Sequence, residues 1–234
     1  MIVGLIVFVA AMVQGLLGFG GALIAMPLLV MIIGIQTATP AYALLGALST
    51  LLNTIRLRHH TTPGDLARLV LPALVGIPLG ILLLTRVDST YVTATLGIIL
   101  IVYAVYNLLG WTVPPLAHPA WAFLAGFSSG VLSGAFNAGG PPVIVYASTR
   151  SWSADRFRGN LQTYFLIVSI FLLIGHAMSG HFTADIGRMV LLAAPALVVG
   201  QMVGARLCRY VEGERFRKLV LWVLLLLGLQ LLFG

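Results

Sequence analysis

The chain has 234 residues, of which 60% are hydrophobic and only 8% are charged, and its formal net charge is +7. Soluble domains contain about 25% charged residues, so lipid rather than water must surround most of this apolar surface. The basic residues lie in short stretches between apolar runs, as in cytoplasmic loops of membrane proteins, which argues against nucleic-acid binding. The single cysteine, Cys208, excludes an internal disulfide.

Eight apolar runs follow one another along the chain. They span residues 2–34, 38–55, 66–85, 91–111, 121–147, 161–178, 186–205 and 219–233. Since a helix needs about 20 residues to cross a bilayer, six of the runs fit one transmembrane helix each. The first run is interrupted at residues 18–21 (GFGG, the first break) and the fifth at residues 137–142 (NAGGPP, the second break). Glycine and proline clusters break helices, so each interrupted run is predicted to be a re-entrant hairpin or a pair of short crossings.

The interrupted runs belong to an internal repeat. Three glycines of the first run recur in the fifth at a constant offset: Gly15, Gly20 and Gly21 correspond to Gly134, Gly139 and Gly140. Downstream, residues 76–110 align without gaps with residues 200–234. The sequence therefore predicts a first transmembrane repeat at residues 1–110, a connecting loop at 111–120 and a second repeat at 121–234. Each repeat contains one broken hairpin and three ordinary helices.

Charge predicts the orientation of the repeats, because basic residues mark the cytoplasmic side. They form three clusters: Arg56/Arg58, Arg150/Arg156/Arg158 and Arg206/Arg209/Arg215/Arg217/Lys218. The third, fourth and fifth runs lie between the first two clusters. If each of these runs crossed the membrane once, the two clusters would face opposite sides. Both clusters can face the cytoplasm only if the broken fifth run returns to the side from which it enters. Each repeat then crosses the membrane an odd number of times. The predicted fold is an all-α polytopic membrane protein with two inverted-topology repeats, an architecture common among secondary transporters.

The sequence around the breaks resembles a known family. Residues 15–27 (GLLGFGGALIAMP) and 134–142 (GAFNAGGPP) are similar to the paired motifs of the sulfite exporter TauE/SafE family, also called the toluene sulfonate uptake permease family. The resemblance covers essentially the whole chain and includes the stretches at residues 60–65 and 176–185. It implies a transporter of small sulfur-containing anions, such as sulfite, sulfonates or related carboxylates. The expected location is the plasma or inner membrane of a bacterium or archaeon.

No lysine or arginine lies near the centre of an apolar run, so a transported anion needs uncharged donors there. Helix N-termini and consecutive glycines offer free backbone N–H groups with partial positive charge. The candidate substrate-binding residues are those of the two breaks and the polar residue one turn before each: Gly18, Phe19, Gly20, Gly21, Asn137, Ala138, Gly139, Gly140, Gln14 and Ser133. Isolated polar residues are candidates for the permeation path: Asn53, Arg158, Gln162 and Gln201.

Other readings of these residues stay open. Glycines at four-residue spacing, such as Gly76/Gly80 and Gly200/Gly204, indicate close helix packing. The five histidines are not spaced as a metal site, and no cofactor is expected. A secondary carrier is the favoured function, with a passive anion channel as the alternative and an intramembrane enzyme as a third class. A coupling ion, either proton or sodium, and a homodimer are compatible with the sequence.

The inverted repeats predict that both termini lie outside and that the loops at residues 56–65 and 206–218 lie inside. Single cysteines introduced into a variant lacking Cys208 can be labelled from outside with an impermeant maleimide. We expect labelling near the termini and none in the two loops. Strong external labelling in the loop at residues 206–218 would contradict the inverted arrangement.

Overall fold

The computed structural model describes residues 2–57, 61, 63–116, 118–208, 210 and 213–233. The arginines and histidines that lie outside this part of the chain are Arg58, His59, His60 and Arg209. The predicted cytoplasmic loops are therefore described only in part.

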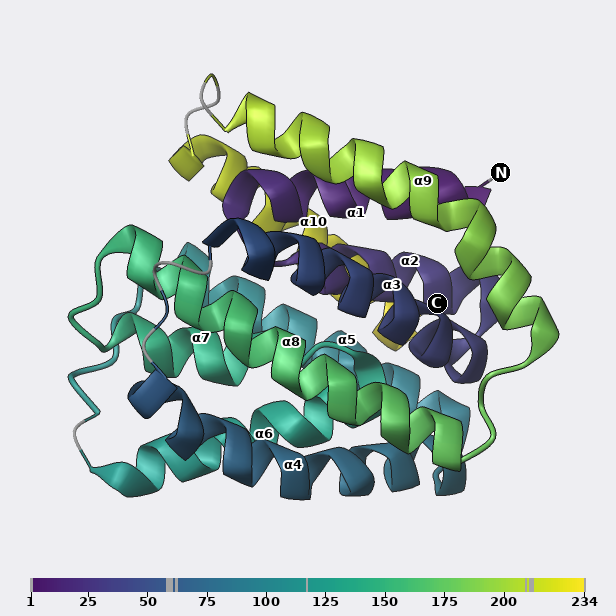
Figure 1. Cartoon of the computed structure of the whole chain (residues 1–234), viewed down its shortest axis with the longest axis horizontal. Helices are drawn as coiled ribbons and strands as arrows, with labels where there is room; N and C mark the ends of the chain where they lie inside the picture. Colours follow the sequence, from purple (N-terminus) through teal and green to yellow (C-terminus); the bar gives the residue numbers. More distant parts are fainter. Residues whose placement is uncertain are drawn as a thin grey trace. The chain divides into compact units, whose positions relative to one another are not determined.

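The described residues form α-helices joined by short connections, as the composition predicted (Figure 1). The helices are α1 (Ile2–Leu17), α2 (Gly21–Ile33), α3 (Ile35–Leu57), α4 (Pro63–Arg86), α5 (Ser89–Leu108), α6 (Pro119–Phe136), α7 (Gly140–Ser148), α8 (Ala154–Met178), α9 (Ala184–Leu207) and α10 (Gly213–Phe233). The helices are interrupted at both predicted breaks: α2 begins at Gly21, the last residue of the first break, and α7 begins at Gly140, within the second.

Five of these helices are long and apolar enough to cross a membrane: α4, α5, α8, α9 and α10. Helix α3, predicted as an ordinary span at residues 38–55, has sufficient length but carries more threonine, serine and asparagine and is not among the five. Helices α1 and α2 are shorter apolar helices. At 1.5 Å per residue, α7 is roughly 14 Å long, less than half of the bilayer's hydrocarbon core.

Helices α8 and α10 begin seven and six residues before their apolar runs, farther than the other helices. Helix α8 starts at Ala154 rather than at 161, and α10 starts at Gly213 rather than at 219. Each has an acidic residue in its first turn, Asp155 or Glu214, where a negative charge interacts favourably with the helix dipole. A hydropathy pattern places the start of a helix at its first apolar residue, so it misses a charged first turn.

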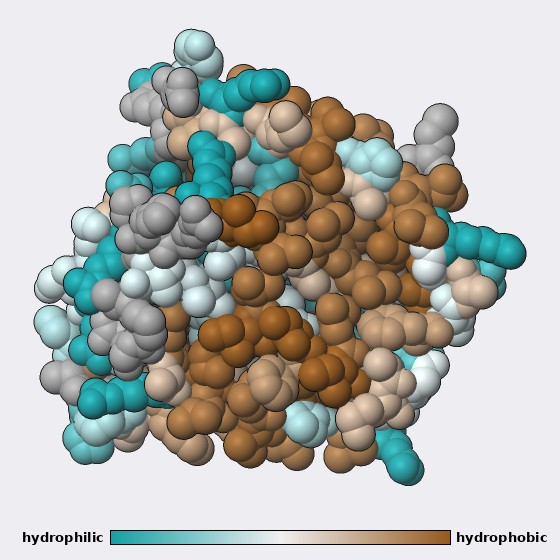
Figure 2. Space-filling model, in the orientation of Figure 1, coloured by the Kyte–Doolittle hydropathy of each residue, from teal (hydrophilic) through white to brown (hydrophobic). Residues whose placement is uncertain are grey.

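The surface is that of a protein surrounded by lipid. Figure 2 shows hydrophobic side chains over most of the central part of the face in view, with hydrophilic side chains toward its margins. Large apolar side chains project outward from the membrane-length helices; Leu191 and Leu192 of α9 are 75% and 82% exposed. Exposure on this scale is stable in hydrocarbon, so the chain is a multi-pass membrane protein.

Helix contacts divide the chain into two compact units. Unit 1 comprises Met1–Leu45, Val87–Trp111 and Thr183–Gly234, and unit 2 comprises Gly46–Arg86 and Thr112–Phe182. In unit 1, α1 packs along α9 and α5 along α10, while α2 contacts α1 and α10. In unit 2, α4 packs along α6 and against α8, and α7 contacts α6 (Figure 1). Each unit thus combines helices from both predicted repeats, whose boundaries stay a prediction.

Glycines bring the backbones of α4 and α6 together in unit 2. A Cβ atom at Gly76, Gly80 or Gly134 would overlap a backbone carbonyl oxygen of the facing helix, those of Phe127, Val131 and Ile77 respectively. Unit 1 repeats this pattern between α1 and α9. There, Gly200, Gly204 and Gly15 meet the carbonyls of Phe8, Met12 and Gln201. These contacts confirm the packing role predicted for Gly76/Gly80 and Gly200/Gly204. They also show that the aligned residues of the two halves make equivalent contacts.

We predict that Gly204→Ala destabilises the protein, because the added methyl group would overlap the Met12 carbonyl oxygen and push two backbones apart. Overpacking of this kind costs about 1–3 kcal/mol. The matched control is Gly187→Ala on the same helix, where no atom lies within 4 Å of the added Cβ. Thermal unfolding in detergent should show a clear loss for Gly204→Ala only. Equal unfolding temperatures for the two variants would contradict the packing role.

Candidate functional site

Helices α1 and α6 end in the same turn at aligned positions. Gly18 has a φ of 85° and donates its backbone N–H to the Gln14 carbonyl at 2.8 Å. Asn137, the aligned residue, has a φ of 53° and donates to the Ser133 carbonyl at 2.9 Å. A left-handed residue that donates to the carbonyl four residues earlier is a common helix C-terminus, and at the end of α6 the Ala138 N–H adds a bond to the Leu132 carbonyl at 3.3 Å. Asparagine is one of the few side-chain-bearing residues that adopt this conformation readily. Asn137 therefore has a backbone role besides any contact with substrate.

The first break continues through a second left-handed residue. Gly20 has a φ of 92°, so a side chain would strain the backbone there, although no atom lies within 4 Å of an added Cβ. Helix α2 then begins at Gly21, where an added Cβ would overlap Oε1 of Gln14. The buried Gln14 side chain thus lies over the start of α2. Gly20 has no side chain to cap the helix, and the N–H groups of the first turn have no acceptor within α2.

Three residues connect α6 to α7, as three connect α1 to α2, but the chemistry of the second break is different. Gly139 has an ordinary φ of −71°, so its backbone conformation does not require glycine. The lack of room does, because a Cβ atom would overlap Oγ of Ser133 and the Ser129 carbonyl. The Ser129 hydroxyl donates a hydrogen bond to the Gly139 carbonyl at 2.5 Å. Helix α7 starts at Gly140 and continues with Pro141 and Pro142, which have no N–H group. The start of α7 therefore offers fewer backbone donors than the start of α2.

The remaining break residues also differ between the halves. Phe19 is half-buried, whereas the aligned Ala138 is buried, so an aromatic side chain that could shape a binding site is present only in the first break. Within each unit, the structure brings the polar residue before the break, Gln14 or Ser133, against the start of the following helix.

The candidate path residues lie on separate helices. Gln201 of α9 is buried, and its carbonyl meets Gly15 in the packing of unit 1. In unit 2, Gln162 of α8 is fully buried, and the amide nitrogen of Asn53 is buried with no hydrogen-bond partner among the described residues. Arg158 is half-buried in the second turn of α8. Their roles in permeation stay predictions.

Three residues near the second break were missed by the sequence analysis. Ser129 lies one helical turn before Ser133 on α6, so the four-residue spacing could have indicated it. Tyr164 and Phe165 come from α8, and no local pattern connects them with the break. Tyr164 is fully buried, and a Cβ on Gly140 would lie 3.9 Å from the Phe165 ring.

The end of α8 carries a histidine pair. Gly180 has a φ of 69°, which lets the His181 backbone N–H donate to the His176 carbonyl at 3.0 Å. The same turn places the two Nδ1 atoms 2.8 Å apart, so one ring donates to the other. No third potential metal ligand joins the pair within the described part of the chain. Nε2 of the buried His176 has no hydrogen-bond partner among the described residues.

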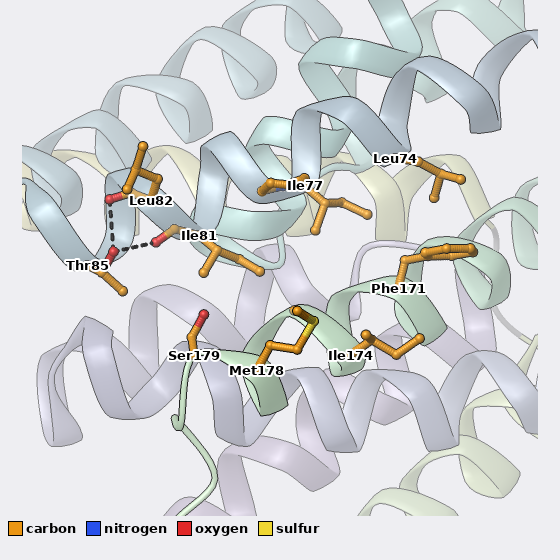
Figure 3. Close-up of a pocket in the computed structure, with 11 residues that line it drawn as sticks. Leu74, Ile77, Ile81, Leu82, Thr85, Phe171, Ile174, Met178 and Ser179 are labelled. Carbon is orange, nitrogen blue, oxygen red and sulfur yellow. Dashed lines mark hydrogen bonds between the residues drawn. The ribbon is translucent and has the colours of Figure 1, made fainter.

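A pocket of about 380 Å³ lies between α4 and α8 within unit 2. In Figure 3, Phe171, Ile174 and Met178 of α8 face the apolar side chains of α4. Its lining contains no charged residue, and the Thr85 hydroxyl is already bonded to the carbonyls of Ile81 and Leu82, each at 3.0 Å. The pocket suits hydrocarbon rather than an anion, so the breaks remain the better candidate site.

Comparison with known proteins identifies a family. A family model described as "Sulfite exporter TauE/SafE" matches residues 3–231, which is nearly the whole chain. No curated protein and no solved structure matches the chain.

The histidine pair predicts a pH-dependent stability. Burial lowers the pKa of His181 below its ordinary value of about 6.5. The folded protein therefore favours the neutral ring, so this contribution to stability is complete above about pH 6.5 and is lost as the pH falls toward the lowered pKa. We expect the thermal unfolding temperature to decrease between pH 7.5 and 5.5, and to decrease less in a His181→Gln variant. The same pH dependence in both proteins would show that the pair does not contribute.

Proposed function

Because the chain belongs to the TauE/SafE sulfite exporter family, we propose that it is a secondary carrier for small sulfur-containing anions such as sulfite or sulfonates. Family membership makes it a membrane transporter of anions, not an enzyme, and the membrane-length helices agree with this. The carrier mechanism, the substrate within this class and the binding residues form the proposal. We infer that the anion binds to backbone N–H groups at the two breaks.

The start of α2 is the observation that carries the proposal. Gly21 and Leu23 are buried in its first turn, where backbone N–H groups have no acceptor within the helix. A buried N–H group needs a partner, and a helix N-terminus carries roughly half a positive charge. An anion satisfies both requirements. No lysine or arginine lies in α1 or α2, so these donors do not compete with a cationic side chain.

The second break contributes in another way. Its helix dipole also presents positive charge, but Pro141 and Pro142 leave the Gly140 N–H as the donor among the first three helical residues. We infer that side-chain donors supply the rest, and the candidates are Ser133, whose Oγ lies beside Gly139, and Asn137, which ends α6. Each break would thus offer an anion a different combination of backbone and side-chain donors.

A passive anion channel could use the same donors, so we predict the behaviour that separates a carrier from a channel. Purified protein in liposomes loaded with unlabelled sulfite should take up ³⁵S-sulfite transiently against its gradient, because a carrier exchanges substrate across the membrane. Uptake should also saturate with concentration. Linear flux without counterflow would indicate the channel. Conversion of a sulfonate to a new product by the purified protein would indicate an enzyme instead.

We predict that Gly20→Val and Gly139→Val each abolish transport in a folded protein. The first replaces a residue with a φ of 92°, and the second places a side chain into the space held by Ser133 and Ser129. Gly187→Ala, which has open space around it, is the control. Normal saturable transport by folded Gly139→Val would contradict the proposed site.

Two variants are needed to test Asn137. Because its φ is 53°, replacement by alanine both removes the side-chain hydrogen bond and strains the backbone. Asn137→Gly keeps the conformation of the aligned Gly18 and removes only the side chain. Loss of one hydrogen bond to the charged anion, about 1.5–3 kcal/mol, should weaken anion affinity about tenfold or more in both variants. If only Asn137→Ala is impaired, Asn137 serves the helix end and does not bind the substrate.

A further inference from the structure

Tyr164 presents a buried polar group that the packing of the helices does not explain. Its side chain is fully buried, and its hydroxyl has no hydrogen-bond partner of ordinary geometry in the described part of the chain. Buried hydroxyl groups are almost always paired, because leaving one unpaired opposes folding. A phenylalanine would fill the same space without this cost. The hydroxyl therefore indicates a partner that the described residues do not supply at ordinary hydrogen-bonding geometry.

The position of the hydroxyl connects it with the second break. It lies beside the Ser129 side chain, whose own proton is used in the hydrogen bond to the Gly139 carbonyl. Gly139 immediately precedes the first residue of α7, and the neighbouring Phe165 approaches Gly140. Tyr164 thus places an O–H donor beside Ser129, the residue that bonds to the Gly139 carbonyl immediately before the helix start at which two prolines have removed backbone donors.

We propose that Tyr164 is a substrate-binding residue whose hydroxyl donates a hydrogen bond to an oxygen of the bound anion at the start of α7. This inference rests on the proposed function and extends it to a residue on a third helix of unit 2. The ligand chemistry is that of an oxyanion, such as a sulfite or the sulfo group of a sulfonate, whose oxygens accept hydrogen bonds. Ser129 is a positioning residue, since it holds the Gly139 carbonyl and so the turn beside the hydroxyl.

The competing role is structural. A small movement would let the Tyr164 hydroxyl donate to a lone pair of Ser129 Oγ and join α8 to α6. The two roles make opposite predictions for Tyr164→Phe, which removes the hydroxyl and nothing else. In the structural role the variant loses a stabilising bond, whereas in the substrate role it loses an unpaired buried group and keeps its stability.

The experiment measures thermal unfolding of purified wild-type and Tyr164→Phe protein, without ligand and across titrations of sulfite and methanesulfonate. We expect the ligand-free variant to unfold at the same temperature as the wild type or higher. Its affinity for either anion should be weaker by about tenfold or more, since a hydrogen bond to a charged group is lost. Tyr103→Phe is the matched control, because Tyr103 is also a buried tyrosine but its helix, α5, adjoins neither break in the sequence. It should keep wild-type affinity.

Two results would overturn the assignment of Tyr164 alone. One is a less stable ligand-free Tyr164→Phe protein with unchanged anion affinity, which would assign the hydroxyl to Ser129. The other is a variant with wild-type stability and affinity. In both cases, loss of transport in the Gly139→Val variant would still support the proposed function, because that variant tests the break independently of Tyr164. Absence of any anion-induced stabilisation in the folded wild type would overturn the proposed function together with this inference.

Discussion

The cost of placing charge in hydrocarbon governs how this protein is built. A basic side chain at the centre of a membrane helix costs at least about 2.5–3.5 kcal/mol, and the apolar runs of this chain carry none near their centres. Neutral backbone dipoles then become the available source of positive potential, and they are exposed only where a helix begins. The chain creates such beginnings inside its two interrupted segments, where α2 starts after Gly20 and α7 after Gly139.

Helix starts serve as binding groups only if they are held in place, and glycine packing provides this in each unit. In unit 1, α1 is fixed against α9 through Gly15 and Gly204, next to the first break. In unit 2, α6 is fixed against α4 through Gly80 and Gly134, next to the second break. Because backbone meets backbone at these points, little movement is available to either helix end. In each unit, the glycines of the helix contact thus lie next to the glycines of the break. The same arrangement occurs in both units at aligned residues.

The pattern of the sequence predicted much of this arrangement. Glycine clusters within overlong apolar runs marked both breaks, and the four-residue spacing marked Gly76/Gly80 and Gly200/Gly204 as packing residues. The family resemblance was confirmed over residues 3–231. The first turns of α8 and α10 were missed because their charged residues interrupt the apolar pattern. The aligned Gly20 and Gly139 looked equivalent, yet one is required by its φ of 92° and the other by close contact with Ser133. Tyr164 could not be predicted, since its relation to the break arises from tertiary packing.

Replacing a single backbone amide by an ester tests backbone N–H binding most directly. Incorporation of lactic acid in place of Ala22, in the first turn of α2, removes one N–H group and keeps the side chain. The same replacement at Ala184, the first residue of α9, is the control. If the start of α2 binds the anion, the Ala22 ester should weaken sulfite affinity by about tenfold, the value of a hydrogen bond to a charged group, while the Ala184 ester leaves it unchanged. Unchanged affinity in a folded Ala22 ester protein would contradict binding by the backbone of α2.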